Sequence, residues 1–125
     1  MDLADYFENA KGIGLLSTAG AEGDVDAAIY ARPHFTDQQT VAFIMADRLT
    51  HRNVTENPHA IYAFIEHGAG YKGKRLYLTK TGEETDPAKI EAIRRRPLPR
   101  ECGVEAESRY LVEFRIDRVR PLVGG

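Results

Sequence analysis

Cysteine, net charge and long apolar runs are all nearly missing from this sequence. The one cysteine, Cys102, cannot form an intramolecular disulfide, which fits a reducing compartment. No segment is apolar and long enough to cross a bilayer, and residues 1–5 lack the basic and apolar runs of a secretion signal. We therefore expect a cytoplasmic protein.

The charge distribution argues against two classes of partner. The formal net charge is −2, and acidic and basic residues are spread along the chain instead of forming a long block. Proteins that bind nucleic acids or membrane surfaces electrostatically carry a basic patch or run. We expect neither a nucleic acid nor a membrane as the partner.

The length and the hydrophobic content predict a single domain over residues 1–125, because 125 residues with 42% hydrophobic content form one core but not two. Apolar runs, period-two alternation, turn signals and helix caps predict six strands and three short helices. The strands are expected over residues 13–18, 25–32, 41–46, 60–66, 75–81 and 110–119, and the helices over residues 3–10, within 47–57 and from 86.

This order of elements predicts a mainly β fold. The sequence has no internal repeat and no strand–helix–strand alternation, so we expect a closed or nearly closed antiparallel barrel of six strands. A barrel this small leaves little room for an enclosed ligand. A binding site is therefore expected on its surface, where a second subunit can share it.

One motif match is misleading. Residues Gly68 to Gly73 spell G-x-G-x-x-G, the pattern of a dinucleotide-binding turn. That turn requires a following helix, whose N-terminus holds the pyrophosphate. Here the next residues, 74–79, are rich in strand formers. The segment is predicted to be a hairpin loop.

The histidines and a run of arginines have ordinary explanations. His59 and His67 are eight residues apart on one predicted strand, a separation of about 26 Å, so they cannot share a metal ion. His34 and His51 lack ligand-like spacing, and no metal site is predicted. Arg94-Arg95-Arg96 falls in the last turn of a predicted helix, where cations favour the negative end of the helix dipole.

The segment from Asp47 to Pro58 is the most informative. A strongly apolar strand runs directly into a helix whose first turn carries Thr50, His51 and Arg52. A hydroxyl group, backbone N–H groups and a guanidinium at the positive end of a helix form a phosphate-binding turn. The alternative is that Thr50 only caps the helix while His51 and Arg52 lie in solvent.

At this segment the sequence resembles the pyridoxamine 5′-phosphate oxidase-like family of FMN-binding split barrels. The resemblance covers roughly residues 1–82 and the last strand is compatible with it. It rests on the N-terminal helix, the hairpin from residues 12–18 to 29–32, the strand 41–45, and Thr50-x-Arg52-Asn53-Val54 followed by Asn57-Pro58.

The resemblance implies a six-stranded split β-barrel that works as a homodimer, with FMN across the subunit interface. The strand-to-helix turn would hold the phosphate, and two neighbouring strands would lie against the flavin ring. Carried over position by position, the phosphate candidates are Thr50, His51 and Arg52, and the flavin-side candidates are Ile29, Tyr30, Ala31, Arg32, Phe43, Ile44 and Met45.

Two departures from the family pattern bear on function. Many members have a lysine where Thr50 stands, so the positive charge would come from Arg52, from Arg32, or from Lys74 or Arg75 of the partner subunit. The basic stretch with which the true oxidases bind substrate phosphate is not matched by Arg109-Tyr110 or by residues 118–120. Oxidation of pyridoxamine phosphate is therefore not expected.

Three functions stay open from the sequence. The first is a flavin-dependent oxidoreductase that acts on a small molecule, with the chemistry carried by FMN. The second is a non-catalytic module that stores FMN or passes electrons to a redox partner. The third is a split barrel that uses the deazaflavin F420 or haem, with His34, His51 or His67 as the haem-ligand candidates.

Overall fold

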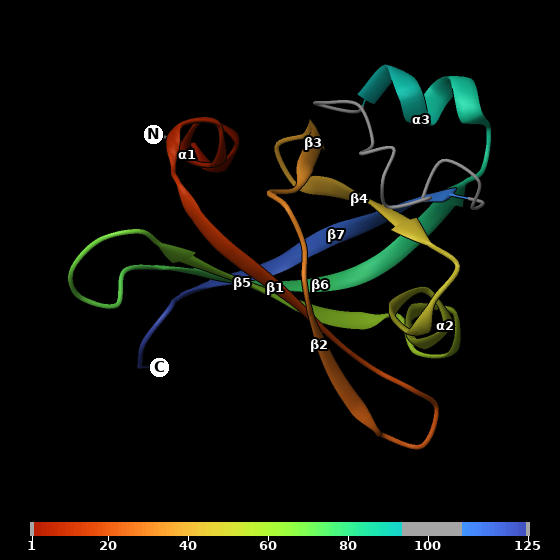
Figure 1. Cartoon of the computed structure of the whole chain (residues 1–125), viewed down its shortest axis with the longest axis horizontal. Coiled ribbons are helices and arrows are strands. Elements are labelled where there is room, and N and C mark those ends of the chain that lie inside the picture. The colour runs from red at the N-terminus through yellow and green to blue at the C-terminus, as the bar shows by residue number, and fades with distance from the viewer. Residues whose placement is uncertain (1, 94–108, 125) are drawn as a thin grey trace, which may run out of the picture.

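The computed structural model describes residues 2–93 and 109–124. The predictions for Arg94-Arg95-Arg96 and for Cys102 lie outside the described residues. The helices are α1 (Leu3–Asn9), α2 (Leu49–Glu56) and α3 (Pro87–Ile93). The strands are β1 (Gly12–Ala19), β2 (Val25–Ile29), β3 (His34–Asp37), β4 (Thr40–Ala46), β5 (His59–Glu66), β6 (Gly73–Glu84) and β7 (Arg109–Pro121) (Figure 1).

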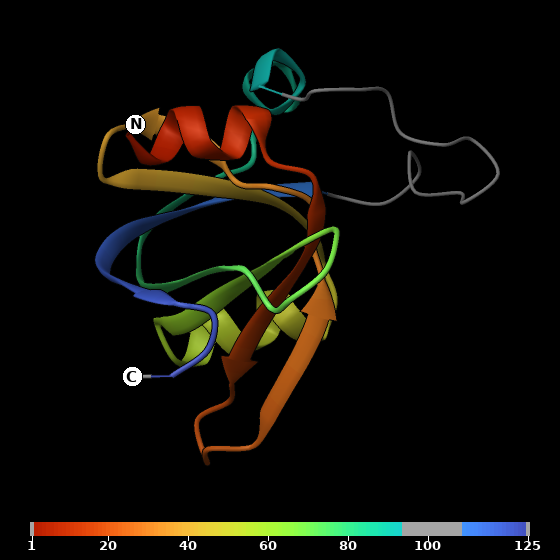
Figure 2. The same ribbon diagram turned by 90° about the vertical axis from the view of Figure 1, so that its left-hand side faces the viewer.

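The described strands form one antiparallel sheet in the order β2-β1-β5-β6-β7-β4-β3. Only residues 30–33 connect the two edge strands, a span of about 18 Å at most. Seven flat strands would hold those edges about 29 Å apart. The sheet must therefore curl, and Figure 2 shows its strands wrapping round a common interior.

The mainly β, split-barrel fold class is confirmed, but the sheet has seven strands instead of six. The additional strand is β3, whose four residues are too few to show a clear alternation. The strand expected over 25–32 ends at Ile29. Beyond that point the Tyr62 hydroxyl donates to the carbonyl oxygens of Tyr30 and Ala31, at 3.2 and 3.1 Å, and Pro33 lacks an N–H group for a ladder.

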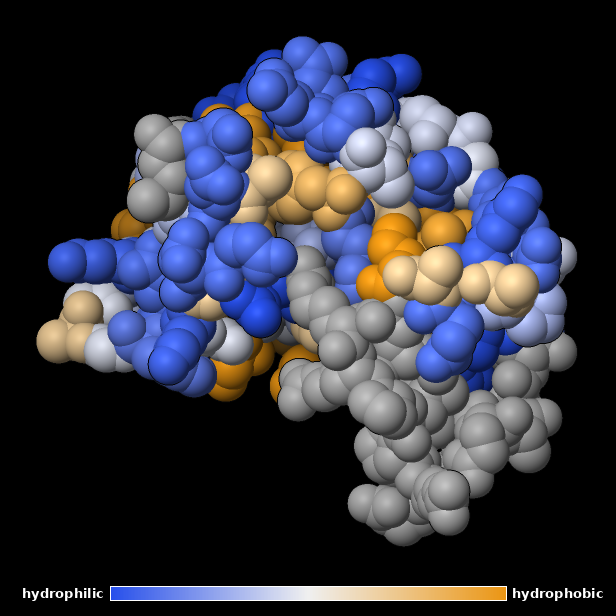
Figure 3. All heavy atoms as spheres, turned by 90° about the horizontal axis from the view of Figure 1, so that it is seen from above, coloured by the Kyte–Doolittle hydropathy of each residue, from blue (hydrophilic) through white to orange (hydrophobic). Residues whose placement is uncertain are grey.

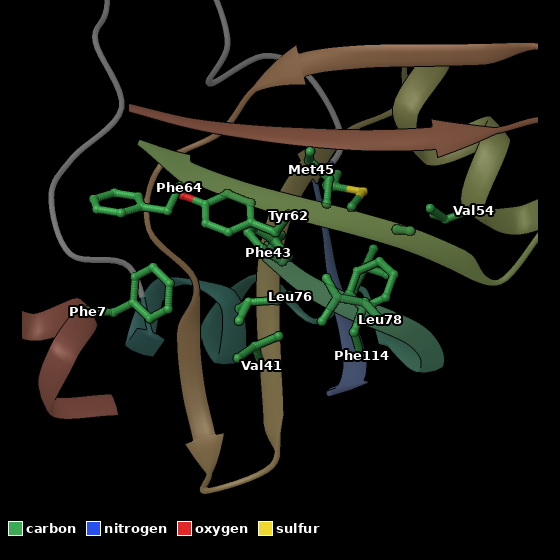
Figure 4. Packing of buried hydrophobic residues seen from close by; sticks show 13 residues of the cluster. Phe7, Val41, Phe43, Met45, Val54, Tyr62, Phe64, Leu76, Leu78 and Phe114 are labelled. Carbon is green, nitrogen blue, oxygen red and sulfur yellow. The ribbon is translucent and has the colours of Figure 1, made fainter. Parts of the chain in front are cut away.

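The core lies inside the curled sheet and is closed at one end by α1. Large side chains from five strands point into it, together with Phe7 of α1 and Val54 of α2 (Figure 4). The face predicted for α1 packs against this core, and the predicted cap is present because the Asp2 carboxylate accepts from the Asp5 N–H at 2.8 Å. The sequence pattern therefore predicted both the buried face and the N-cap of this helix correctly.

The predictions for the helix after residue 86 and for the loop at residues 67–73 are confirmed. Asp86 caps α3 by accepting from the Ala88 N–H at 3.0 Å, and Ile90 and Ile93 pack on a second apolar cluster with Ala42 and Leu111. Residues 67–72 lead into β6, which begins at Gly73, so a strand and not a helix follows the glycine-rich segment.

The surface differs between two sides of the molecule. Seen from the side of α1 and α3, it is mainly hydrophilic, with apolar atoms visible in the gaps (Figure 3). The outer face of β2, β1 and β5 is apolar, because the residues paired across these strands include Ile29 with Leu15 and Leu15 with Ala63. Ile29 is 73% exposed and Ile13 is 48% exposed. None of the helices in the described part of the chain is long and apolar enough to span a membrane.

Candidate functional site

The first turn of α2 is the centre of the candidate site. β4 ends at Ala46, and α2 begins after an extended N-cap residue, Arg48, whose side chain makes no capping hydrogen bond. The first turn contains no acidic residue. Among the residues that the structure describes, no side chain is seen to cap its backbone N–H groups, which lie at the positive end of the helix and are suited to an anion. The alternative in which Thr50 serves only as the N-cap is wrong, since that position is Arg48.

Thr50 is buried and connects the helix to the segment after β2. A side-chain hydrogen bond links it to Tyr30. Burial raises the pKa of the Tyr30 hydroxyl, and Asp26 adds to that effect, while the hydrogen bond from Thr50 and the charge of Arg109 act in the opposite direction. Tyr30 also packs edge-on against Phe43, with ring centroids 5.9 Å apart. The hydrogen bond between Thr50 and Tyr30 thus links the first turn of α2 to the segment after β2.

Arg109 supplies a positive charge that the sequence analysis did not assign to the site. It is the first residue of β7 and pairs with Ala46, the last residue of β4. Its charge acts on Tyr30, which bonds to Thr50. Arg48 adds a second basic residue at the N-cap itself. Only the strand pairing reveals Arg109, because 62 positions separate it from Asp47 along the chain.

His51 lies on the same turn, but the protein's own carboxylates surround its imidazole ring. Nδ1 is 3.3 Å from an Asp47 oxygen, and Nε2 is 2.8 Å from a Glu83 oxygen. The ring stacks on Tyr110, with centroids 3.8 Å apart and planes 12° apart. Both ring nitrogens are therefore engaged within the chain.

Arg52 lies on a different face of α2 from Thr50. Residues two apart on an α-helix point about 200° apart, so their side chains diverge. Arg52 lines a groove of about 480 Å³ between α2 and the β1–β2 turn, together with four acidic residues: Glu22, Asp24, Asp26 and Glu56. The structure therefore brings Thr50 and His51 to the buried side of the turn and places Arg52 in an acidic groove.

The flavin-side candidates lie in several different environments. Phe43 and Met45 point into the core, at 2% and 1% exposure, whereas Ile44 packs on the α3 cluster. Ile29 is on the exposed apolar face, and Ala31 accepts from the Tyr62 hydroxyl through its carbonyl. Arg32 donates to the carbonyl oxygens of Phe7, Glu8 and Ala10, at 2.8, 3.2 and 3.2 Å, at the end of α1.

Lys74 and Arg75 lie at the opposite end of β6 from Glu83. Nine residues of strand separate Lys74 from Glu83, a distance of about 30 Å. The Lys74 ammonium is 4.7 Å from the Tyr6 ring centroid, and Arg75 donates to the carbonyl oxygens of Pro121 and Gly124. Within one chain these two residues do not reach the first turn of α2.

Metal binding has no obvious location. Across residues 2–93 and 109–124, no group of three His, Cys, Asp or Glu side chains is arranged to hold an ion. Of the haem-ligand candidates, His51 is bonded as described, His34 is half-buried at the start of β3, and His67 is exposed in the β5–β6 loop.

Comparison with known proteins shows the fold. No protein-family model and no curated protein matches the chain. Among solved structures, an FMN-binding protein from Syntrophomonas wolfei superposes with a TM-score of 0.73 at 14% identity, over 97% of this chain and 84% of that one. An F420 reductase gives 0.70 at 17% identity, over 93% and 94%. A pyridoxamine 5′-phosphate oxidase-like protein from Listeria innocua gives 0.66 at 15% identity, over 96% and 94%.

Proposed function

We propose that this chain, which has the split-barrel fold of FMN-binding and pyridoxamine 5′-phosphate oxidase-like proteins, binds FMN and works as a flavin-dependent oxidoreductase on a small molecule. The observation that carries the proposal is the first turn of α2, which lacks a capping side chain and adjoins Thr50, Tyr30 and Arg109. Bound FMN would supply hydride or electron transfer.

The residues at this turn fit a phosphate group. Backbone N–H groups of the first turn and the Thr50 hydroxyl supply neutral donors, and Arg48 and Arg109 supply positive charge. The lysine that many members have at position 50 is thereby replaced by arginines at two other positions. Arg52 would contribute only at longer range, because it lies on another face of α2, in a groove lined by acidic residues.

The strands named by the resemblance would hold the flavin ring. The side chains of Phe43 and Met45 are buried, so these positions would contact the ring through the backbone, and Tyr30 would form the wall nearest the phosphate. The protein's contribution is to bind and orient the ring and to exclude water from it. The described residues point to no general acid or base for the reaction.

A homodimer is part of the proposal. The outer face of β2, β1 and β5 exposes apolar side chains, and a contiguous patch of this kind marks a protein interface. A second copy with the same face would cover it, as expected of an isologous dimer. Lys74 and Arg75 would then reach the phosphate only from the partner subunit, since β6 separates them from it within one chain.

The second candidate is F420, which the similarity to the F420 reductase favours. The two ligands can be separated by titrating the purified protein with FMN, riboflavin, F420 and haem while recording absorbance and flavin fluorescence. FMN that is retained through dialysis on a dimer-sized species, and bound more tightly than riboflavin, would support the proposal. Retention of F420 or haem instead would contradict it, and retained FMN without turnover would favour an electron-transfer module.

Two arginine variants test the location of the phosphate. Arg109→Gln is expected to weaken FMN binding by roughly tenfold, because it removes one positive charge beside the proposed phosphate position. Arg52→Gln is the matched control on the other face of α2 and is expected to change the affinity by less than about threefold. A larger loss of FMN affinity in Arg52→Gln than in Arg109→Gln would instead place the phosphate in the groove that Arg52 lines.

A further inference from the structure

His51 is the most completely enclosed ionisable side chain beside the candidate phosphate-binding turn. The residue is 8% exposed and sits in the first turn of α2, and its ring lies flat on Tyr110 of β7. Its Nε2 faces Glu83 of β6 across 2.8 Å, and its Nδ1 faces Asp47 of the β4–α2 turn across 3.3 Å. The imidazole therefore connects three separate elements at one point.

Making both carboxylate contacts as hydrogen bonds requires a proton on each ring nitrogen. A carboxylate only accepts hydrogen bonds, and a neutral imidazole has a single N–H donor. Two donated bonds to two carboxylates require N–H groups on both nitrogens, which is the imidazolium cation. The pKa of Glu83 agrees with this pairing. Partial burial acts to raise the pKa of the Glu83 carboxyl group, but hydrogen bonds from His51 and Lys80 outweigh that effect and lower the pKa.

Several of the described elements bring charged groups close to His51. Asp47 and Glu83 are negative, and the Lys80 ammonium is 3.0 Å from the same Glu83 oxygen that faces His51. Tyr110 stacks on the ring, and Arg109 is its chain neighbour on β7. If His51 is neutral, these groups leave two carboxylates close to the turn with fewer positive charges to balance them. A phosphate dianion at the turn would then be attracted less strongly.

We propose that His51 is a positioning residue whose imidazolium form holds the first turn of α2 against β6 and β7 and offsets Asp47 and Glu83, so that phosphate binding and His51 protonation are coupled. This inference rests on the proposed function, because it assigns a role at the same phosphate-binding turn. His51 needs no direct contact with the ligand. By linkage, FMN binding would then favour proton binding by His51, and the contribution of His51 to FMN affinity is expected to fall as the pH rises.

The test compares wild type with His51→Gln, which keeps one amide donor but does not titrate. FMN and riboflavin affinities are measured by fluorescence quenching from pH 5.5 to 8.5. At pH 6 wild type is expected to bind FMN roughly tenfold more tightly than the variant, and the advantage should shrink to about twofold by pH 8.5. Riboflavin, which lacks the phosphate, should show no such trend. Below about pH 6 the FMN phosphate loses one negative charge, which also weakens its attraction to His51, so the affinity ratio is interpreted at and above that pH.

Two further variants supply a matched control and a second test of the inference. His67→Gln, in the exposed β5–β6 loop, is the matched control and should follow the wild-type profile. Glu83→Gln retains His51 but removes one carboxylate, so the affinity advantage should disappear at a lower pH than in wild type. It serves as the main test if His51→Gln does not fold by circular dichroism. NMR provides a separate readout, in which the titration midpoint of the His51 ring proton moves to higher pH with FMN and not with riboflavin.

The outcomes separate this inference from the proposed function. A His51→Gln profile parallel to wild type over the whole pH range, with FMN still preferred to riboflavin, would overturn the role of His51 alone. Equal wild-type affinities for FMN and riboflavin, or no flavin binding at all, would overturn the phosphate-binding turn and this inference with it. A pH-dependent ratio lost in His51→Gln and kept in His67→Gln would establish the coupling.

Discussion

The N-termini of α1 and α2 meet the same physical requirement in different ways. At α1 the Asp2 carboxylate accepts from the Asp5 N–H, and Asp86 does the same for Ala88 at α3. At α2 the corresponding residue is Arg48, whose side chain makes no capping bond. Since the first N–H groups of any helix need acceptors, two helix ends are completed by the chain and the third is suited to an external anion.

This difference matters because it coincides with other polar features. The first turn of α1 carries an acidic residue, Asp5, whereas the α2 turn has Thr50 bonded to Tyr30 and Arg109 nearby. A helix terminus alone would be weak evidence for a binding site. Its combination with a hydroxyl, two arginines and a fold used by FMN-binding proteins is what supports the proposal.

The largest expected effect comes from giving α2 the cap that α1 already has. Arg48→Asp replaces a positive charge with a carboxylate that would accept from the first-turn N–H groups. FMN affinity is expected to fall by roughly 100-fold, since two unit charges change near the phosphate. The free energy of unfolding should rise by about 0.5–1 kcal/mol, because aspartate is a favoured N-cap. Fluorescence titration and urea denaturation measure the two effects.

Arg48→Ser separates capping from charge. Serine also caps the helix but removes only one unit of charge, so its effect on FMN affinity should lie between those of wild type and Arg48→Asp. Unchanged FMN affinity in both variants would show that the α2 terminus does not hold the phosphate.

The reciprocal change at α1 is expected to alter stability alone. Asp2→Ala removes the bond to the Asp5 N–H and should lower the free energy of unfolding by about 1 kcal/mol, while Asp2→Asn should retain most of it. FMN affinity should be the same in both variants, because α1 closes one end of the core and lies well away from α2 (Figure 1). A loss of FMN affinity in Asp2→Ala would mean that the two helix ends are not independent.

The sequence predicted the local elements better than the site. The amphipathic face and Asp2 cap of α1 and the apolar run of β4 are encoded within a few residues, and both elements were located within one residue at their ends. β3 was missed, and β6 extends to Glu84, three residues beyond the prediction, because its last residues pair with β7 across register shifts. Pairing of that kind depends on residues distant in sequence.

The site was only partly predictable for the same reason. The strand-to-helix turn could be recognised from consecutive residues, but Thr50 and Arg52 were grouped although helical geometry directs them to different faces. Glu83 and Arg109 reach the turn through β6 and β7, so no local pattern could include them. Sequence spacing located the turn, and the sheet supplied its charged surroundings.

The smallest expected effect concerns the acid stability of the α2 turn compared with α1. The pKa of Glu83 is lowered in the folded protein, so its contact contributes stability above the ordinary pKa of a glutamate and loses it as the pH falls through the folded-state value. Glu83→Gln should therefore flatten the dependence of unfolding free energy on pH below about pH 5.

Glu8→Gln, on α1, is the control for removing one carboxylate and should keep the wild-type slope. The slopes can be obtained from urea denaturation at several pH values between about 3 and 6, where a glutamate titrates. Equal slopes for Glu83→Gln and wild type would mean that the contacts of Glu83 with His51 and Lys80 do not stabilise the turn, and that its charged surroundings act on ligands alone.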